Sequence, residues 1–259
     1  MKICIYQDAG AELVPVLVQS INKAVKNISA IFPQLINTRT VTVSADDVKN
    51  GSCFQTCKLF VLPGGRDFPY VKKLHGVGVA NIKKFVNQGG SLLGLCAGAY
   101  FSSCFVDFER GTPLEVIGKR ELCLFKGTTR GCVYPGFDYH GSVSARMAPL
   151  TFSNSPKFPQ FKNLGNDLAA YFNGGCEFIP DEGFRDYDVL ADYSDYPGSS
   201  AIIHLLFGRG KVILSGVHPE MDPEFLDRRN YRDDQWAAIE RYKDGQFDIL
   251  KGVLQILML

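Results

Sequence analysis

The first hundred residues alternate between short, continuously apolar runs and longer segments in which apolar residues recur at helical spacing. The apolar runs predict buried strands at residues 3–6, 41–43, 58–62 and 91–95. Helical spacing is clear in residues 12–28, with Pro15 in the first turn, and in residues 77–88, which end at a Gly pair typical of a helix C-cap. Near-continuous apolar strands separated by helices are typical of a parallel sheet covered on both faces.

The middle of the chain has a different pattern. Between about residues 110 and 180 it is rich in Gly, Pro, Tyr and Phe. Short alternating stretches at 121–125 and 169–172 predict antiparallel strands. We expect these strands and the loops around them to cover one side of the sheet.

The last third of the chain begins with a hairpin pattern. Residues 201–207 and 211–215 are apolar runs that flank a Gly-Arg-Gly turn. The tail from residue 222 onward is predicted to close as helix against the sheet. Neither a linker nor an internal repeat interrupts the sequence, so we expect a single domain, residues 1–259.

Composition narrows the class of protein. Of the 259 residues, 46% are hydrophobic and 21% charged, an ordinary globular composition that argues against disorder. The formal net charge of +1 offers no basic excess for a phosphate backbone, so nucleic acid is not expected as a partner. No apolar run approaches the roughly 20 residues of a membrane helix, so membrane association is not expected. The N-terminal MKICIYQDAG is predicted to be a first strand, not a signal peptide.

Eight cysteines are scattered along the chain, at positions 4, 53, 57, 96, 104, 123, 132 and 176. Most stand inside apolar runs, where cysteine behaves as a small buried hydrophobe, and a chain of this length has no need of disulfides to fold. We therefore expect free thiols and a cytoplasmic setting. Cys53 and Cys57 could begin a metal site, but no second ligand pair follows at suitable spacing, so no metal and no cofactor are predicted.

The stretch Gly94-Leu95-Cys96-Ala97-Gly98 carries the most informative chemistry. It has the form G-x-C-x-G, directly after a predicted strand and directly before a predicted helix. Such a turn leaves no room for side chains two residues either side of its centre and presents the central thiol at the carboxyl end of the sheet. Cys96 is therefore a candidate nucleophile, and the Ala97 N–H a candidate oxyanion donor. The alternative is a cysteine that only packs.

A thiol nucleophile needs a base, and the chain has four histidines. His204 stands inside an apolar strand and is expected in the core, whereas His75 and His140 are expected at the surface. His218 follows the strand predicted at 211–215 and precedes Glu220 by two residues. Both side chains can turn inward there, with the carboxylate orienting the imidazole. The alternative for His218 is a solvated loop.

The loop Pro63-Gly64-Gly65 also comes directly after a predicted strand. A Gly pair lets the backbone approach a ligand closely, so the Gly65 N–H is a second candidate oxyanion donor. The alternative is an ordinary turn with no functional role. Three such loops at three strand ends, each able to supply one part of an acyl-transfer site, favour the functional interpretation.

Together, these three motifs resemble those of the class I glutamine amidotransferase superfamily. The resemblance implies an α/β fold, a three-layer flavodoxin-like sandwich with a mostly parallel central sheet and an antiparallel extension. It also implies a triad in which Cys96 is the nucleophile, His218 the base and Glu220 the orienting carboxylate.

More narrowly, the chain resembles the N-terminal domain of eukaryotic biotin–protein ligases. The matching strings are LPGGRDFPY at 62–70, GLCAGAYF at 94–101, KGTTRG at 126–131, YFNGGCEF at 171–178 and GRGKVILSGVHPE at 208–220. A biotin–protein ligase makes its biotinyl-adenylate in a separate catalytic domain, so biotin ligation is not expected from this chain alone. The resemblance makes that catalytic domain a candidate partner.

One position departs from the amidotransferase pattern. Class I glutamine amidotransferases usually have a Gln four residues after the nucleophile, where it helps to hold the glutamine substrate. Here that position is Tyr100, which argues against glutamine as the substrate.

Further residues beside the motifs are candidates for a substrate pocket. They are Gly64, Asp67, Tyr70, Tyr100, Asn173 and Gly174. The leading hypothesis is an amidotransferase- or amidase-like domain that acts on a small-molecule amide or acyl substrate. One alternative is a non-catalytic regulatory or binding module associated with a biotin–protein ligase catalytic domain. Another is a redox-sensing thiol at Cys96 with Cys104 as the resolving partner.

Overall fold

The computed structural model describes residues 1–139 and 141–259, so the surface position predicted for His140 lies outside the described residues. Within them, nine strands form the central sheet in the order β2-β1-β3-β4-β13-β12-β11-β8-β9. The first five, which pair in parallel, are β2 (Arg39–Val43), β1 (Lys2–Tyr6), β3 (Cys57–Leu62), β4 (Ser91–Leu95) and β13 (Gly210–Ser215). The antiparallel extension consists of β12 (Ser200–Phe207), β11 (Tyr187–Tyr193), β8 (Arg146–Phe152) and β9 (Ala169–Phe172).

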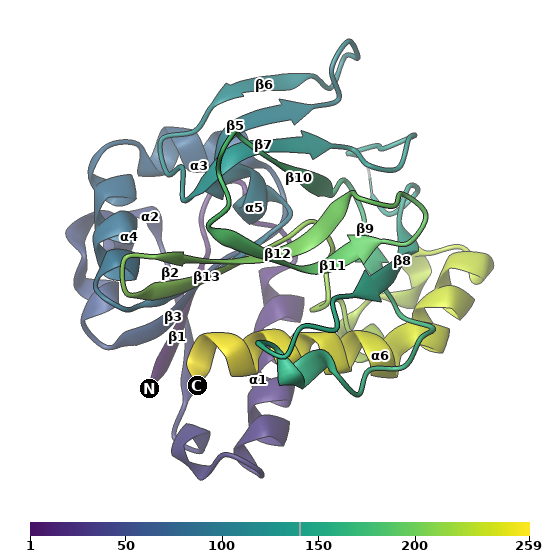
Figure 1. The fold of residues 1–259 in the computed structure, drawn as a ribbon, viewed down its shortest axis with the longest axis horizontal. Helices are drawn as coiled ribbons and strands as arrows, with labels where there is room; N and C mark the ends of the chain where they lie inside the picture. Colours follow the sequence, from purple (N-terminus) through teal and green to yellow (C-terminus); the bar gives the residue numbers. More distant parts are fainter. Residues whose placement is uncertain (140) are drawn as a thin grey trace.

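A second sheet of four strands packs beside the central one, above it in Figure 1. Its strands, in spatial order, are β10 (Cys176–Pro180), β7 (Phe125–Gly131), β5 (Ser103–Phe108) and β6 (Val116–Lys119). β5 and β7 are parallel to each other, and the outer pairs are antiparallel. This sheet supplies part of one cavity wall described below.

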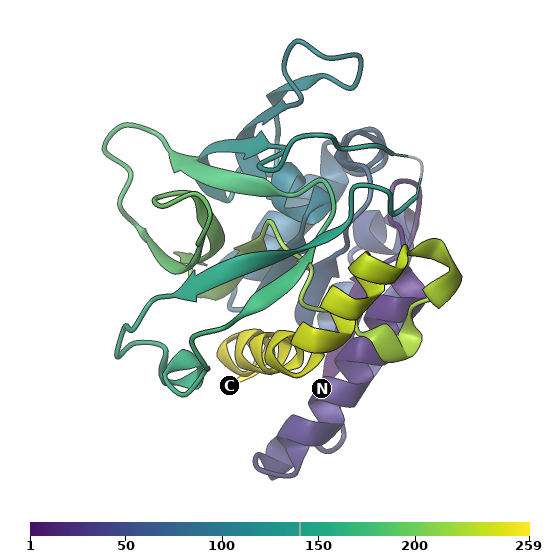
Figure 2. The ribbon, with the colours of Figure 1, turned by 90° about the vertical axis from the view of Figure 1, so that its right-hand side faces the viewer.

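Helices cover both faces of the parallel strands. One face is covered by α1 (Val14–Ser29) and α6 (Asp233–Met258), which lie side by side in Figures 1 and 2. The other face carries α2 (Ala45–Asn50), α3 (Asp67–Leu74), α4 (Val77–Asn87) and α5 (Ala97–Ser102). Short 3₁₀ turns occur at Pro33–Leu35, Ser52–Gln55, Pro159–Phe161, Pro223–Phe225 and Arg228–Asn230.

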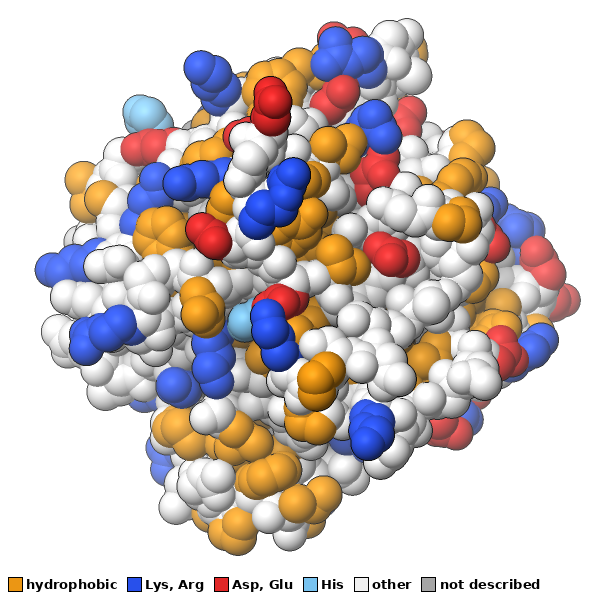
Figure 3. Space-filling view, in the orientation of Figure 1, with side chains coloured by type: hydrophobic (Ala, Val, Ile, Leu, Met, Phe, Trp, Pro, Cys, Tyr) orange, Lys and Arg blue, Asp and Glu red, His pale blue; other side chains and the backbone are white. Residues whose placement is uncertain are grey.

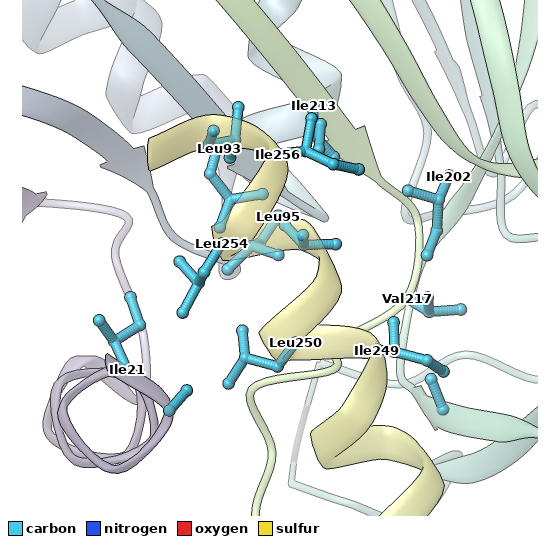
Figure 4. Close-up of a cluster of buried hydrophobic side chains, with 14 of the residues drawn as sticks. Ile21, Leu93, Leu95, Ile202, Ile213, Val217, Ile249, Leu250, Leu254 and Ile256 are labelled. Atoms are coloured by element: carbon cyan, nitrogen blue, oxygen red, sulfur yellow. The ribbon is translucent and has the colours of Figure 1, made fainter. Parts of the chain in front are cut away.

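Successive side chains along each strand point to opposite faces of the sheet, so the core has one layer on each face. In β1, Ile3 and Ile5 pack on the side of α1 and α6, whereas Cys4 and Tyr6 pack on the opposite side. Figure 4 shows the first layer, in which residues of α6 lie between Ile21 of α1 and the central strands. Because both faces of β1 are buried, its sequence reads as a continuous apolar run.

Most of the predicted elements are confirmed, with ends shifted by one or two residues. The predicted hairpin forms between β12 and β13, and the C-terminal tail ends in α6. The strand predicted at 121–125 is wrong for residues 121–124, because Cys123 has a positive φ of 34° that turns the chain before β7 begins. The α/β sandwich with a mostly parallel centre and an antiparallel extension is confirmed.

The expectation of free thiols is wrong for one pair. Cys104 and Cys123 form a disulfide, with Cα atoms 4.0 Å apart. The parallel pairing of β5 with β7, in which Ser103 is opposite Phe125, brings these residues together. Cys104 is therefore not a resolving thiol for Cys96 in this structure.

No helix within residues 1–139 and 141–259 is long and apolar enough to cross a membrane. Figure 3 shows acidic and basic side chains interspersed over the visible face, in keeping with a net charge of +1.

Candidate active site

Cys96 occupies a strained turn between β4 and α5. Its backbone has φ 45° and ψ −102°, a conformation that non-glycine residues rarely adopt and that costs about 1–3 kcal/mol. A Cβ on Gly94 would lie 2.8 Å from the carbonyl oxygen of Gly98, and one on Gly98 would collide with the carbonyl of Leu62. The Cys96 N–H donates to the Ser215 carbonyl at 2.8 Å. The two glycines therefore permit the close packing that holds the turn.

His218 and Glu220 form a buried pair just past the end of β13. The His218 Nδ1–H donates to Glu220 Oε1 at 2.7 Å, and the two side chains are 6% and 1% exposed. The His218 N–H donates to the Tyr171 carbonyl at 2.7 Å, so β9 fixes the backbone of this segment. A Cβ on Gly64 would meet both the His218 ring and the Cys96 side chain, so these two side chains lie at the same point. The structure thus brings all three predicted triad residues together.

The charge of His218 is set by competing effects. Burial lowers its pKa, but the Glu220 carboxylate, supported by its hydrogen bond to the ring and by the nearby Cys96, outweighs burial and raises the pKa to about 10. His218 therefore holds a proton at neutral pH. Glu220 Oε2 is buried without a hydrogen-bond partner among the described residues, so only its other oxygen is engaged.

Of the Gly pair after β3, Gly64 packs against the triad and Gly65 against the loop at Gly10. A Cβ on Gly64 would lie 2.5 Å from His218 Cε1 and 3.6 Å from the Cβ of Cys96. Gly65 has φ +127°, and a side chain there would collide with the Gly10 carbonyl. Only residues without side chains fit this approach, which explains the Gly pair in the sequence.

The three motifs open into a cavity of about 480 Å³. The predicted site residues that line it are Gly64, Gly65, Asp67, Cys96, Ala97, Tyr100, Asn173, Gly174 and His218. Glu220 lies behind His218, in contact with its ring. Tyr70 lies beneath the Gly pair and does not line the cavity. Its hydroxyl donates to the Pro63 carbonyl at 3.1 Å, so it supports the loop.

The polar side chains predicted for the substrate pocket already make hydrogen bonds within the protein. Asn173 Oδ1 accepts a hydrogen bond from the Ser144 hydroxyl at 2.7 Å, and its Nδ2 donates to the Gly141 carbonyl at 3.4 Å. The Tyr100 hydroxyl donates to the Gly174 carbonyl at 3.2 Å. These bonds fix the loops around the cavity.

Asp67 is held by an arginine that the sequence did not indicate. Arg120 Nε donates to Asp67 Oδ2 at 2.6 Å, and the side chains are 5% and 10% exposed. Burial raises the pKa of Asp67, and the Arg120 guanidinium opposes this rise. The pair places a neutralised carboxylate in the cavity wall.

Sequence reasoning missed the aromatic lining. Phe108, Phe137, Tyr139 and Tyr231 all line the cavity, from segments far apart in the sequence. The cluster of aromatic residues at 134–139 was a usable signal for two of them. Within residues 1–139 and 141–259, no group of three His, Cys, Asp or Glu side chains is placed to hold a metal ion.

The fold is that of the class I glutamine amidotransferase-like proteins. A putative GMP synthase subunit from Thermoplasma acidophilum has a similar structure, with a TM-score of 0.56 and 14% sequence identity. The similarity covers 99% of this chain and 94% of that chain.

The chain belongs to the biotin–protein ligase N-terminal family, whose model matches residues 1–259. It is 33% identical over 237 residues to a biotin–protein ligase of Schizosaccharomyces pombe, covering 89% of this chain and 35% of the ligase. It is 42% identical over 173 residues to an uncharacterized protein of Chlamydia muridarum, covering 66% of this chain and 63% of that protein. The chain thus spans about a third of the first relative and less than two thirds of the second.

Proposed function

We propose that this domain is a cysteine-dependent amidohydrolase or acyl transferase that acts on a small-molecule amide or related acyl compound. One observation carries the proposal: the strained Cys96 and the buried His218–Glu220 pair meet at one cavity. A packing cysteine has no need of a positive φ, nor of a buried imidazolium beside it.

Each triad residue has a separate role in the proposed reaction. The Cys96 sulfur attacks the acyl carbon, and His218, which holds a proton at neutral pH, is the acid beside it. When the C–N bond breaks, His218 gives that proton to the leaving amine, and a thioester on Cys96 remains. Water then releases the carboxylic acid, or an amine or alcohol takes the acyl group. Glu220 keeps the imidazole oriented through Nδ1.

The backbone N–H groups of Gly65 and Ala97 are the proposed oxyanion donors. Both residues line the same cavity as Cys96. Ala97 is the first residue of α5, where N–H groups have no acceptor inside the helix. Loss of one such donor typically lowers the rate roughly 10²–10³-fold.

Alkylation of Cys96 by iodoacetamide, followed by peptide mass mapping, tests the proposal. Cys53 is an internal control, because burial raises its pKa to about 12 and keeps it a thiol at neutral pH. At pH 7 we expect Cys96 to react at least about tenfold faster in the parent than in His218→Asn, whereas Cys53 reacts at the same slow rate in both. Equal rates, or a rate that ignores His218, would contradict a catalytic role.

A second candidate function is a non-catalytic module that associates with a biotin–protein ligase catalytic domain in the cytoplasm. The observation that favours it is the 35% coverage of the Schizosaccharomyces pombe ligase, in which the matching segment is part of a longer chain. A Cys96 without enhanced reactivity, together with binding to a separately produced ligase catalytic domain, would support this candidate instead.

A further inference from the structure

Aromatic side chains line the cavity on the side of Cys96. A Cβ on Gly174 would lie 2.6 Å from Phe137 Cε2, and the Gly174 carbonyl oxygen is 3.7 Å from Cys96 Sγ. Phe137 packs edge to face on Phe108 and on Tyr139, with ring centroids 5.5 and 4.8 Å apart. This aromatic wall offers a flat apolar group contact area close to the reactive sulfur.

A second aromatic pair lies on the His218 side of the cavity. The Tyr171 ring packs edge to face on the His218 ring, with centroids 6.0 Å apart. It also packs on Tyr231 at 6.1 Å, and the two hydroxyls lie 3.3 Å apart. A group bound next to the triad therefore meets aromatic carbon from both the Cys96 side and the His218 side.

Several polar side chains of the lining are already engaged. Asn173 is bonded to the loop at 141–144, the Tyr100 hydroxyl donates to a backbone carbonyl, and Asp67 is paired with Arg120. A ligand that needed these groups would have to break bonds within the protein first. Without replacement partners, its own polar groups would lose their hydration uncompensated.

The cavity lining also contains few positively charged groups that could bind a carboxylate. Apart from His218, Arg66 is the one cation among the described lining residues. Its guanidinium is half exposed, lies 3.7 Å from a Glu12 carboxylate oxygen and stacks on Tyr139 at 4.8 Å from the ring centroid. Free glutamine carries a carboxylate, which finds no buried, uncommitted cation among the described lining residues.

We infer that the site takes amides whose acyl group is uncharged and aromatic or otherwise apolar, and not free glutamine. This inference rests on the proposed function and names its substrate class. The reaction is hydrolysis: the Cys96 sulfur bonds to the acyl carbon, the C–N bond breaks, and the amine leaves with the proton held by His218. Water then cleaves the thioester to the carboxylic acid and restores the thiol.

Two substrates with the same leaving group test the inference on the purified chain. They are 3-phenylpropionyl-4-nitroanilide and L-γ-glutamyl-4-nitroanilide, and released 4-nitroaniline is followed by absorbance. We expect kcat/KM to be at least about tenfold higher for the phenylpropionyl compound, since a charged acyl group gains no partner in the cavity. Equal or faster cleavage of the glutamyl compound would overturn the inference.

Binding to Cys96→Ala separates this inference from the proposed function. If neither anilide is cleaved, the proposed function is contradicted, and calorimetry on the variant then decides the substrate class. We expect 3-phenylpropionamide to bind at least about tenfold more tightly than L-glutamine. Equal affinities, tighter glutamine binding or no binding of either compound would overturn the inference.

Phe137→Leu tests whether the aromatic wall binds the apolar acyl group, and Phe184→Leu is the matched control. Phe184 stacks on Tyr187 with ring centroids 5.8 Å apart and is not part of the cavity lining. Phe137→Leu is expected to weaken binding of 3-phenylpropionamide to the Cys96→Ala chain by about tenfold, whereas Phe184→Leu leaves it unchanged. The same affinity in both variants would exclude the aromatic wall as the binding surface.

Discussion

The imidazole of His218 lies so close to Gly64 that any side chain at position 64 would clash with it. A Cβ on Gly64 would lie 2.5 Å from His218 Cε1 and 3.3 Å from its Nδ1. The second atom is the one that bonds Glu220. The loop after β3 therefore limits where the imidazole can stand.

Gly64→Ala is expected to displace His218 from Cys96, while the protein still folds. A catalytic group misplaced by about 1 Å can lower a rate roughly 10²-fold, so we expect a fall of that order in amide cleavage and in Cys96 alkylation at pH 7. Gly165→Ala is the control, because no atom lies within 4 Å of the Cβ built there. Unchanged rates in Gly64→Ala would show that His218 does not act on Cys96.

Glu220→Gln is expected to lower the pKa of His218. Burial by itself lowers that pKa, and the Glu220 carboxylate is the main cause of its rise to about 10. The amide carries no charge, so burial dominates in the variant and the ring loses its proton at a lower pH. Titration of the His218 ring nitrogens by NMR measures this. The same titration curve in both proteins would contradict the assigned cause.

The raised pKa of His218 also makes folding stability depend on pH. Folding favours the protonated ring, so its contribution is complete below the ordinary value of 6.5 and is lost as the pH rises through about 10. Over this window we expect the parent to lose more stability than Glu220→Gln, by on the order of a few kcal/mol. Urea unfolding at several pH values measures the difference, and parallel curves would refute it.

Gln246 on α6 ties together the segments on either side of the triad. Its side chain is 1% exposed, its Oε1 accepts from the Tyr171 N–H at 2.6 Å and its Nε2 donates to the Met221 carbonyl at 2.7 Å. Tyr171 bonds the backbone of His218, and Met221 directly follows Glu220. Gln246 is therefore a positioning residue for the triad.

Gln246→Leu is expected to lower the free energy of unfolding by about 2–5 kcal/mol, because one buried donor and one buried acceptor lose their partners. We also expect slower alkylation of Cys96 in molecules that remain folded. Gln255→Leu on the same helix is the control, since the Gln255 side chain makes no hydrogen bond to another described residue. A destabilised Gln246→Leu with normal Cys96 reactivity would leave Gln246 a purely structural role.

The meeting of the triad could be predicted because each motif follows a strand of a parallel sheet. β3, β4 and β13 are neighbours in the sheet, so Gly64, Cys96 and His218 leave it at the same edge. The aromatic lining could not be predicted in the same way. Phe108 ends β5, whereas Tyr231 directly follows the 3₁₀ turn that precedes α6. Only tertiary packing brings these segments to one cavity.

Arg120→Met is expected to destabilise the protein in a pH-dependent way. Burial raises the pKa of Asp67, and the Arg120 guanidinium, 2.6 Å away, opposes this rise. Without Arg120 the buried carboxylate is uncompensated at pH 7, a change that costs about 3–5 kcal/mol.

The sign of the pH dependence follows from which state keeps the proton. In Arg120→Met, folded Asp67 keeps its proton to a higher pH than unfolded Asp67, so stability is greatest at acidic pH and falls as the pH rises. Urea unfolding at pH 5 and pH 8 measures this fall relative to the parent. The double variant Asp67→Asn/Arg120→Met is the control, and it should lack the extra fall because it has no titrating carboxyl at this position. An equal loss of stability in Arg120→Met at both pH values would show that Asp67 is not the group left uncompensated.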